Sequence, residues 1–268
     1  MPQDTFLIPV PPRHLSVLRS WDVTPAHLAY RIGPGPRLLR ADTPSLPRGG
    51  LMYLDHRGYD GLGSPDALLQ EVLRECRRQD HAGVILAFDR PLPPLERLAA
   101  RLDEQLRRSG RTLYVTEIFA HHAPGARVMI PSALSGGSLS QRLSEACRSF
   151  GAERTVLALD RVAEDFSLPA PTGSGTPLTR EELSRQIDRL RPSIFFSPEL
   201  CARYFTYMSR EGSAHFVLFD DSDTLRRKTD TARQLGIHTF LLPWPLLEPC
   251  GAALGVPRMP SRTPNRHP

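Results

Sequence analysis

The stretch HAGVILAFDRPLPPLERLAARLDEQLRRSGRTLYVTE, residues 81–117, decides the fold of this 268-residue chain. Its two continuous apolar runs, at 83–89 and 112–117, indicate strands that are buried on both faces. The segment between them has leucines at helical spacing, namely Leu95, Leu98, Leu102 and Leu106. A strand, a helix and a second strand in this order predict a parallel α/β unit.

The same alternation continues on both sides of this unit. Further apolar runs that read as strands lie at 51–55, 127–133, 154–160, 193–197, 215–221 and 238–244. Amphipathic segments separate many of them. No glycine-rich phosphate turn follows an early strand, which argues against a dinucleotide-binding sheet. The number of strands favours an α/β fold of the closed (β/α)8 barrel type, in a single domain over residues 1–256. The Pro-rich segment 257–268 is predicted to be a disordered tail.

Composition and charge exclude several partners. The formal net charge is +5, and all but one of the 34 basic residues are Arg. These Arg residues are spread along the chain and interleaved with acids, so we predict no nucleic-acid partner. The apolar runs are far shorter than the roughly 20 residues that a membrane-spanning helix needs. The N-terminus has no signal-peptide pattern, so we expect a cytoplasmic protein, or one packaged into a spore.

Motifs in the last third of the chain point to a known family. They comprise YFTY (204–207), HFVLFD (215–220), a helical stretch with Leu225 and Lys228, Gly236, and Trp244 after the last apolar run. In this order they resemble the closing segment of family 18 glycoside hydrolases, especially the bacterial branch that acts on spore-cortex peptidoglycan. Residues 81–117 resemble that family's fourth strand, its helix and its fifth strand, and ARVMIPSALSGG (126–137) lies where its sixth strand would be.

The resemblance covers roughly residues 50–245 and implies a numbering of the strands. Residues 193–197 and 215–221 then belong to a small hairpin insertion between strands seven and eight. The first two barrel strands must come from the weak N-terminal runs, 6–10 and 27–32.

The family's chemistry, as the resemblance implies, needs a DxxDxDxE-type ending on strand four. The Glu protonates the glycosidic oxygen, and the Asp two residues earlier orients the N-acetyl group that acts as the nucleophile, an exception to the usual two-carboxylate scheme. In this sequence Ile85 and Ala87 stand at two Asp positions, and Asp89 stands at the position of the Glu. The sixth strand, IPSAL (130–134), also lacks the family's Tyr. The motif for catalysis is therefore degraded.

Other polar residues follow predicted strands, at the barrel end where active sites form. Asp89 and Glu117 are the candidate catalytic residues. The candidate substrate-binding residues are Asp55, His56, Asp160 and Trp244. A His/Asp/Glu cluster in this region is a possible metal site in principle, but pairing with the many Arg residues is the favoured interpretation, and we predict no metal and no cofactor.

These observations predict a glycosidase-like barrel with impaired catalysis. It binds an N-acetylated glycan such as a peptidoglycan fragment, or serves as a spore-envelope-associated protein. One alternative is an active glycoside hydrolase that uses Asp89 as its general acid, with Glu117 as a rearranged partner. A second alternative is an unrelated barrel enzyme built on Asp55, His56 and Glu117.

Overall fold

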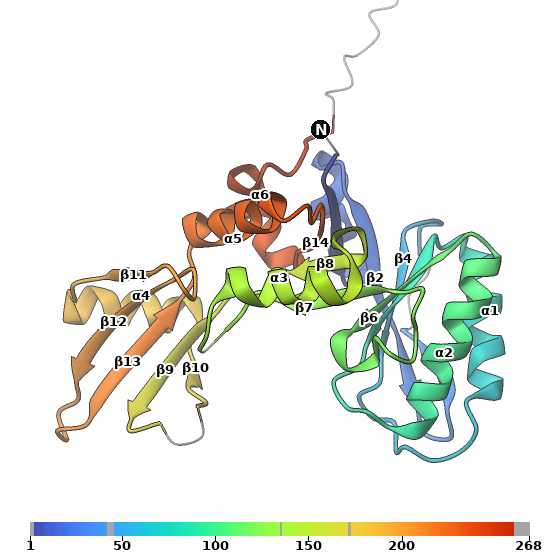
Figure 1. Ribbon diagram of the computed structural model, residues 1–268, viewed down its shortest axis with the longest axis horizontal. Coiled ribbons are helices and arrows are strands. Elements are labelled where there is room, and N and C mark those ends of the chain that lie inside the picture. Colours follow the sequence, from blue (N-terminus) through green and yellow to red (C-terminus); the bar gives the residue numbers. More distant parts are fainter. Residues whose placement is uncertain (1–2, 42–45, 135, 171–172, 260–268) are drawn as a thin grey trace, which may run out of the picture. The chain divides into compact units, whose positions relative to one another are not determined.

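A computed structural model describes residues 3–41, 46–134, 136–170 and 173–259. The chain divides into two compact units (Figure 1). The first unit comprises the described residues within Thr5–Arg127 and Leu242–Pro268, and the second comprises those within Met1–Asp4 and Val128–Leu241.

The first unit is built on parallel strands. β1 (Thr5–Val10) pairs with β2 (Thr24–Gly33), β2 with β4 (Leu51–Asp55), β4 with β5 (Gly83–Ala87), and β5 with β6 (Thr112–Thr116), all in parallel. β3 (Arg37–Arg40) adds an antiparallel edge to β2. The two weak N-terminal runs therefore form strands, as the sequence predicted.

Helices follow the strands of this unit as their sequence patterns require. They are the 3-10 helices η1 (Pro12–Ser20) and η2 (Glu117–Phe119), and the α-helices α1 (Asp66–Gln79), α2 (Pro93–Arg108) and α6 (Trp244–Leu254). The four leucines of α2 that recur at helical spacing are each at most 1% exposed. Their burial is the main reason that this short helix is stable, because isolated helices of this length are marginal in water.

The second unit continues the same pattern. β7 (Arg127–Pro131) pairs with β8 (Thr155–Ala158), and β8 with β14 (Thr239–Leu241), again in parallel. α3 (Leu139–Phe150) and η3 (Ala152–Arg154) connect β7 to β8, and α5 (Ser222–Gln234) precedes β14. With β1, β2, β4, β5 and β6, these strands make the eight of a closed (β/α)8 barrel, the fold class that the sequence predicted.

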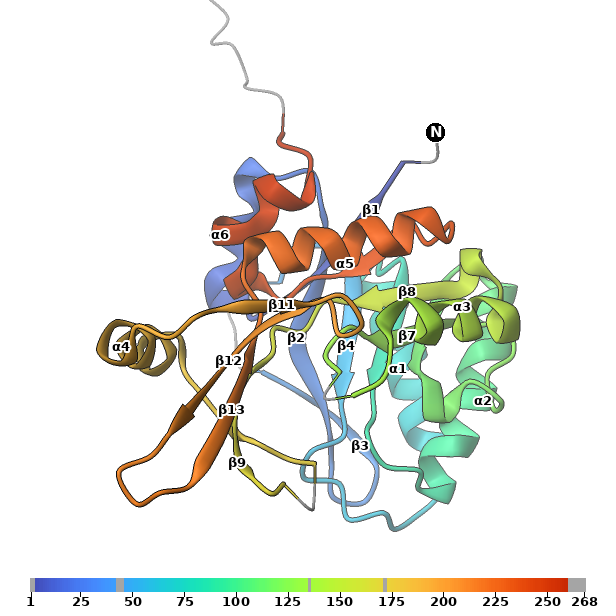
Figure 2. The ribbon, with the colours of Figure 1, turned by 60° about the vertical axis from the view of Figure 1, so that its left-hand side comes forward.

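The segment between β8 and α5 is larger than the small hairpin expected from the sequence. It forms a separate antiparallel sheet in the order β10-β9-β13-β12-β11. The strands are β9 (Ala163–Leu168), β10 (Thr176–Pro177), β11 (Phe195–Ser197), β12 (Ala202–Met208) and β13 (Ala214–Phe219). We call this sheet, with helix α4 (Arg180–Leu190), the insertion. Figure 2 shows α4 along one side of it, where Leu183 packs with Phe205 and Val217.

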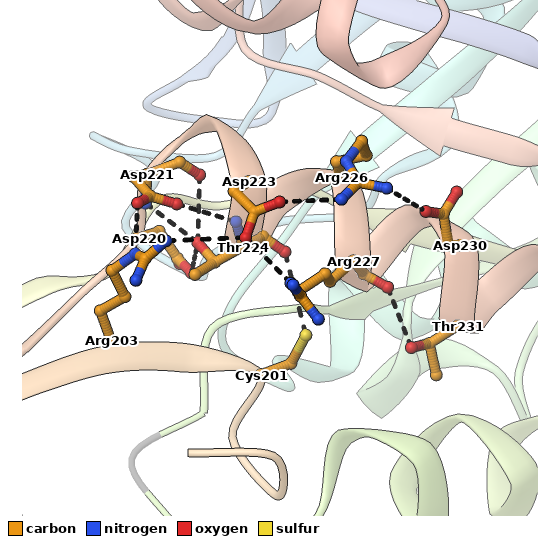
Figure 3. Close-up of polar contacts among 10 residues, drawn as sticks. All are labelled: Cys201, Arg203, Asp220, Asp221, Asp223, Thr224, Arg226, Arg227, Asp230 and Thr231. Carbon is orange, nitrogen blue, oxygen red and sulfur yellow. Dashed lines mark hydrogen bonds and ion pairs between the residues drawn. The ribbon is translucent and has the colours of Figure 1, made fainter. Parts of the chain in front are cut away.

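The two ends of the insertion are bonded to each other. The backbone N–H of Asp220 donates to the carbonyl of Val162 at 2.8 Å, and the N–H of Val162 donates to the Asp220 carboxylate at 3.0 Å. The neighbouring Asp221 caps α5 by accepting from the N–H of Thr224, whose hydroxyl also contacts Asp220 (Figure 3). The chain thus leaves β8 and returns to α5 at one tightly bonded junction.

Two remaining expectations concern the ends of the chain and the membrane. The predicted tail, 257–268, lies outside the described residues from position 260 onward. Residues 257–259 of this segment are described. The Arg258 guanidinium lies 3.7 Å from the centre of the Trp21 ring, so the start of the segment packs against the residue that follows η1. In the described part of the chain, no helix has both the length and the apolar character needed to cross a membrane.

Candidate functional site

The strand register shows the setting of the residues that stand where the resemblance implies carboxylates. Ile85 pairs with Tyr53 on β4 and with Tyr114 on β6, and Ala87 pairs with Asp55. Directly paired residues point to the same side of a sheet. We call the face that carries these five residues the inner face. The middle layer of this face is therefore aromatic and aliphatic, with Ile85 fully buried, at a position where the resemblance implies an acid.

Asp89 lies just beyond the end of β5, and 79% of its side chain is exposed. Its carboxylate oxygen lies 3.1 Å from Nε2 of His56, which is 1% exposed and packs edge-on against Phe88. The approach is close but is not aligned as a hydrogen bond, and neither ring nitrogen of His56 has a hydrogen-bond partner in the described residues. The structure thus brings together two of the candidate residues, an exposed acid and a buried imidazole.

Asp55 ends β4 and is held by Arg57. It accepts hydrogen bonds from the backbone N–H of Arg57 at 2.8 Å and from its guanidinium Nε at 2.6 Å. Partial burial on its own raises the pKa of Asp55, but the bonds from Arg57 outweigh it and hold the pKa below its usual value. Asp55 is therefore an ionised acceptor, which does not suit it to donate a proton as a general acid.

A cavity of about 550 Å³ opens beside Asp55. It lies within the first unit, over β2, β3 and the end of β4. Its lining comprises Leu28, Ala29, Tyr30, Arg31, Leu39, Arg40, Ala41, Tyr53, Asp55 and Arg57. A concave, largely apolar wall with a few charged groups is the usual form of a small-ligand site. Sequence reasoning identified Asp55 but missed Arg31, Tyr53 and Arg57. Their positions at the ends of β2 and β4 were the available signal.

The remaining candidates lie in different settings. Glu117 follows β6 and begins η2, half-buried. Trp244 begins α6, and its ring stacks on that of His14 from η1, with centroids 4.1 Å apart and an angle of 15° between the planes. Asp160 follows β8 in the second unit. Loss of surrounding water raises its pKa, although the residue keeps exposed surface, and Lys228 partly counteracts this shift.

The site has no group of metal-binding side chains. No cluster of three or more His, Cys, Asp and Glu residues suited to a metal ion occurs in the described residues. His121 and His122 are neighbours whose ring centres lie 3.7 Å apart, and Nε2 of His122 lies 3.7 Å from a carboxylate oxygen of Glu96.

Comparison with solved structures places this architecture among known barrels. The chain is similar to the spore cortex-lytic enzyme SleL of Bacillus megaterium QM B1551, with 14% identity and a TM-score of 0.65 over 92% of this chain and 74% of that one. A chitinase from Chromobacterium violaceum gives 15% identity and a TM-score of 0.65, over 94% of this chain and 98% of that one.

A class V chitinase from Nicotiana tobaccum, solved in complex with NAG4, gives 12% identity and a TM-score of 0.66, over 95% of this chain and 99% of that one. No family model matches the sequence, and no curated protein matches it. Identities this low establish the fold alone. The chain is accordingly a barrel with the fold of the chitinases and spore cortex-lytic enzymes, which is the fold that the resemblance to family 18 implied.

Proposed function

We propose that this protein binds an N-acetylated glycan, such as a peptidoglycan fragment, and hydrolyses it poorly or not at all. Ala87 is the observation that carries the proposal. It stands on the inner face, beside Asp55, where the family's mechanism needs the carboxylate that orients the substrate's N-acetyl group.

Without a carboxylate at position 87, no residue there orients the N-acetyl group, which acts as the nucleophile in the family's mechanism. Correct orientation of a reacting group is worth up to about 7–11 kcal/mol. Asp55 does not replace the missing acid, because two bonds from Arg57 already hold its carboxylate. Asp89 is shorter than Glu by one methylene, and its side chain is 79% exposed, so it is poorly placed to hold a proton near a buried glycosidic oxygen.

Binding has separate support. The cavity of about 550 Å³ is large enough for at least one sugar ring, and it offers an aromatic ring from Tyr53 together with charged groups. The fold is shared with chitinases, one of them solved with NAG4 bound. A barrel that has lost its acids can keep such a site, because recognition of a sugar and cleavage of its linkage depend on different groups.

The test is a titration and a hydrolysis assay run on the same sample. Chitotetraose and a soluble muropeptide are titrated calorimetrically, and release of a fluorogenic aglycone from a chitobiose substrate is followed in parallel. We expect saturable binding of at least one glycan and turnover near the uncatalysed background. Absence of binding to both would overturn the proposal, and so would turnover well above background.

One observation favours the active-glycosidase alternative. The 3.1 Å approach of His56 to Asp89 gives a close imidazole neighbour to the acid that stands where the resemblance implies the catalytic Glu. The variant Asp89→Asn separates the two functions, with Asp60→Asn, on an exposed loop, as its matched control. Wild-type turnover that Asp89→Asn abolishes and Asp60→Asn preserves would establish the alternative.

A further inference from the structure

We propose that Arg31 makes the cavity select glycans that carry a carboxylate over neutral ones. This rests on the proposed function, because it assumes that the cavity beside Asp55 is the glycan site. The selection follows from the distribution of charge in the lining, which contains three Arg residues and one carboxylate.

Two of these three guanidinium groups have partners. Arg57 is held by Asp55 through its Nε. Arg40 lies 3.8 Å from Glu75 on α1, which belongs to a different part of the unit from the cavity lining. Asp55 and Arg57 therefore neutralise each other. Arg40 shares Glu75 with Arg78, which donates to the same carboxylate at 2.7 and 2.8 Å, so the charge of Arg40 is partly compensated by an acid that does not line the cavity.

The third guanidinium group of the lining, that of Arg31, has no such partner among the residues that the structure describes. It lies on β2 directly opposite Asp55 on β4, lines the cavity and is exposed to solvent. Within the described part of the chain, its side chain forms no hydrogen bond and no ion pair. The lining of the cavity consequently carries at least one positive charge without a partner in the described residues, that of Arg31.

The apolar residues around Arg31 strengthen its attraction for a carboxylate. Leu28, Leu39 and Tyr53 line the same cavity, and their apolar surface displaces water from one side of any ligand there. Charge pairs are stronger where the local dielectric constant is lower. A guanidinium also presents a planar fork of donors that matches the two oxygens of a carboxylate.

The chemistry distinguishes two kinds of N-acetylated glycan. A chitin oligomer carries no charge. A peptidoglycan disaccharide carries a carboxylate on its lactyl group, or on the stem peptide when the lactyl group is amidated. Both sources present the same group to Arg31, so the shared feature is an acetamido sugar with an attached carboxylate.

The experiment compares matched ligands by calorimetric titration at low salt. The first is the disaccharide of N-acetylglucosamine and N-acetylmuramic acid with a free lactyl carboxylate. The second is its lactyl methyl amide, which has nearly the same size and no charge. The third is the corresponding disaccharide dipeptide, and chitotetraose is the neutral reference.

Three variants accompany the wild type. Arg31→Gln keeps much of the side-chain length and removes the charge, and Arg31→Lys keeps the charge without the fork. Arg74→Gln is the matched control, because Arg74 is an exposed residue on α1 that does not line the cavity. Thermal unfolding midpoints confirm that each variant is folded, which is expected because both positions are exposed.

We expect the wild type and Arg74→Gln to bind a carboxylated ligand roughly five- to tenfold more tightly than the methyl amide, with the preference shrinking as salt is raised. Arg31→Gln should bind both with the same affinity, and Arg31→Lys should retain part of the preference. A preference for the free acid identifies the lactyl group as the source, and one confined to the dipeptide identifies the peptide.

The results that would contradict the inference differ from those that would contradict the proposed function. If the wild type binds the carboxylated ligands and the methyl amide equally, the inference is wrong and the proposed function stands. If Arg31→Gln keeps the preference, another group selects the carboxylate and the inference is wrong. If no glycan binds, both the inference and the proposed function fail.

Discussion

The ammonium group of Lys228 lies 2.7 Å from the carboxylate of Asp220, and neither side chain has any exposed surface. The same carboxylate accepts from the N–H of Val162 at 3.0 Å and from the hydroxyl of Thr224 at 2.8 Å. A buried ion pair is tolerated when further hydrogen bonds satisfy it in this way. The only lysine of the chain therefore neutralises an acid at the junction of the insertion.

Lys228→Met is expected to destabilise the protein by about 3–5 kcal/mol, because it leaves the Asp220 carboxylate buried without its counter-charge. The measurement is the free energy of unfolding in urea. Arg226→Ala, on the exposed side of the same helix, is the control and should leave the unfolding curve unchanged. A small effect of Lys228→Met would show that the carboxylate is satisfied by hydrogen bonds alone.

Restoring the family's acids should create activity only in combination. Ala87→Asp with Asp89→Glu returns an orienting carboxylate and lengthens the acid. Ala87 is half-buried at the end of β5, so the larger side chain has space to reach solvent. We expect each single variant to remain near background and the double variant to release the fluorogenic aglycone measurably, by the roughly 10²–10⁴-fold that general acid catalysis supplies. An inactive, folded double variant would indicate that the Tyr missing from strand six is also required.

Two buried histidines, His27 on β2 and His81 just before β5, make the free energy of unfolding depend on pH. Burial, followed by the neighbouring His81, lowers the pKa of His27 to about 4, from 6.5. Burial also lowers the pKa of His81. In the unfolded chain these two groups take up protons at a higher pH than in the folded chain. Their contribution to the free energy of unfolding is therefore fully present above about pH 6.5 and is lost as the pH falls toward 4.

For His27 alone the loss amounts to roughly 3 kcal/mol. Urea unfolding at a series of pH values from 7.5 to 4.5 measures it. His27→Gln has no proton to gain and should show a correspondingly weaker pH dependence than the wild type. Parallel pH profiles for the two proteins would mean that His27 is not buried as the structure places it.

The ring of His14 stacks on one face of Trp244, and we expect the protein to bind glycan more tightly when His14 is removed. The stacked imidazole occupies a ring face on which a sugar would otherwise pack. Since an aromatic pair is worth about 0.5–1.5 kcal/mol, His14→Ala should raise glycan affinity roughly two- to tenfold, and adding Trp244→Ala should remove that gain. Calorimetric titration with the muropeptide gives both affinities. Weaker binding by His14→Ala would instead identify His14 as a glycan contact.

The barrel strands could be predicted because their signal is local. Continuous apolar runs such as 83–87 and 155–158 are buried on both faces, and this leaves a pattern that needs no knowledge of the partner strand. The insertion was underestimated for the opposite reason. β9 reads AEDFSL, and its polar residues are stabilised by cross-strand contacts, including the 2.8 Å approach of Asp165 to His215 on β13. Such contacts depend on tertiary structure.

The candidate site was only partly predictable. The sequence alone shows that Ile85 and Ala87 stand where the resemblance implies acids, because positions two apart on a strand share a face. That Asp55 is occupied by Arg57, or that Trp244 is covered by His14, depends on side-chain packing between a strand and a loop or between two helices. Pairing of Asp55 with an Arg agrees with the expectation that the many Arg residues neutralise these acids.

The bonded junction at Val162 and Asp220 has an evolutionary consequence. Because the insertion leaves and rejoins the chain at one point, its length and sequence can change without altering the register of β7, β8 or β14. Natural selection can thus vary this sheet as a replaceable module while the barrel keeps its fold.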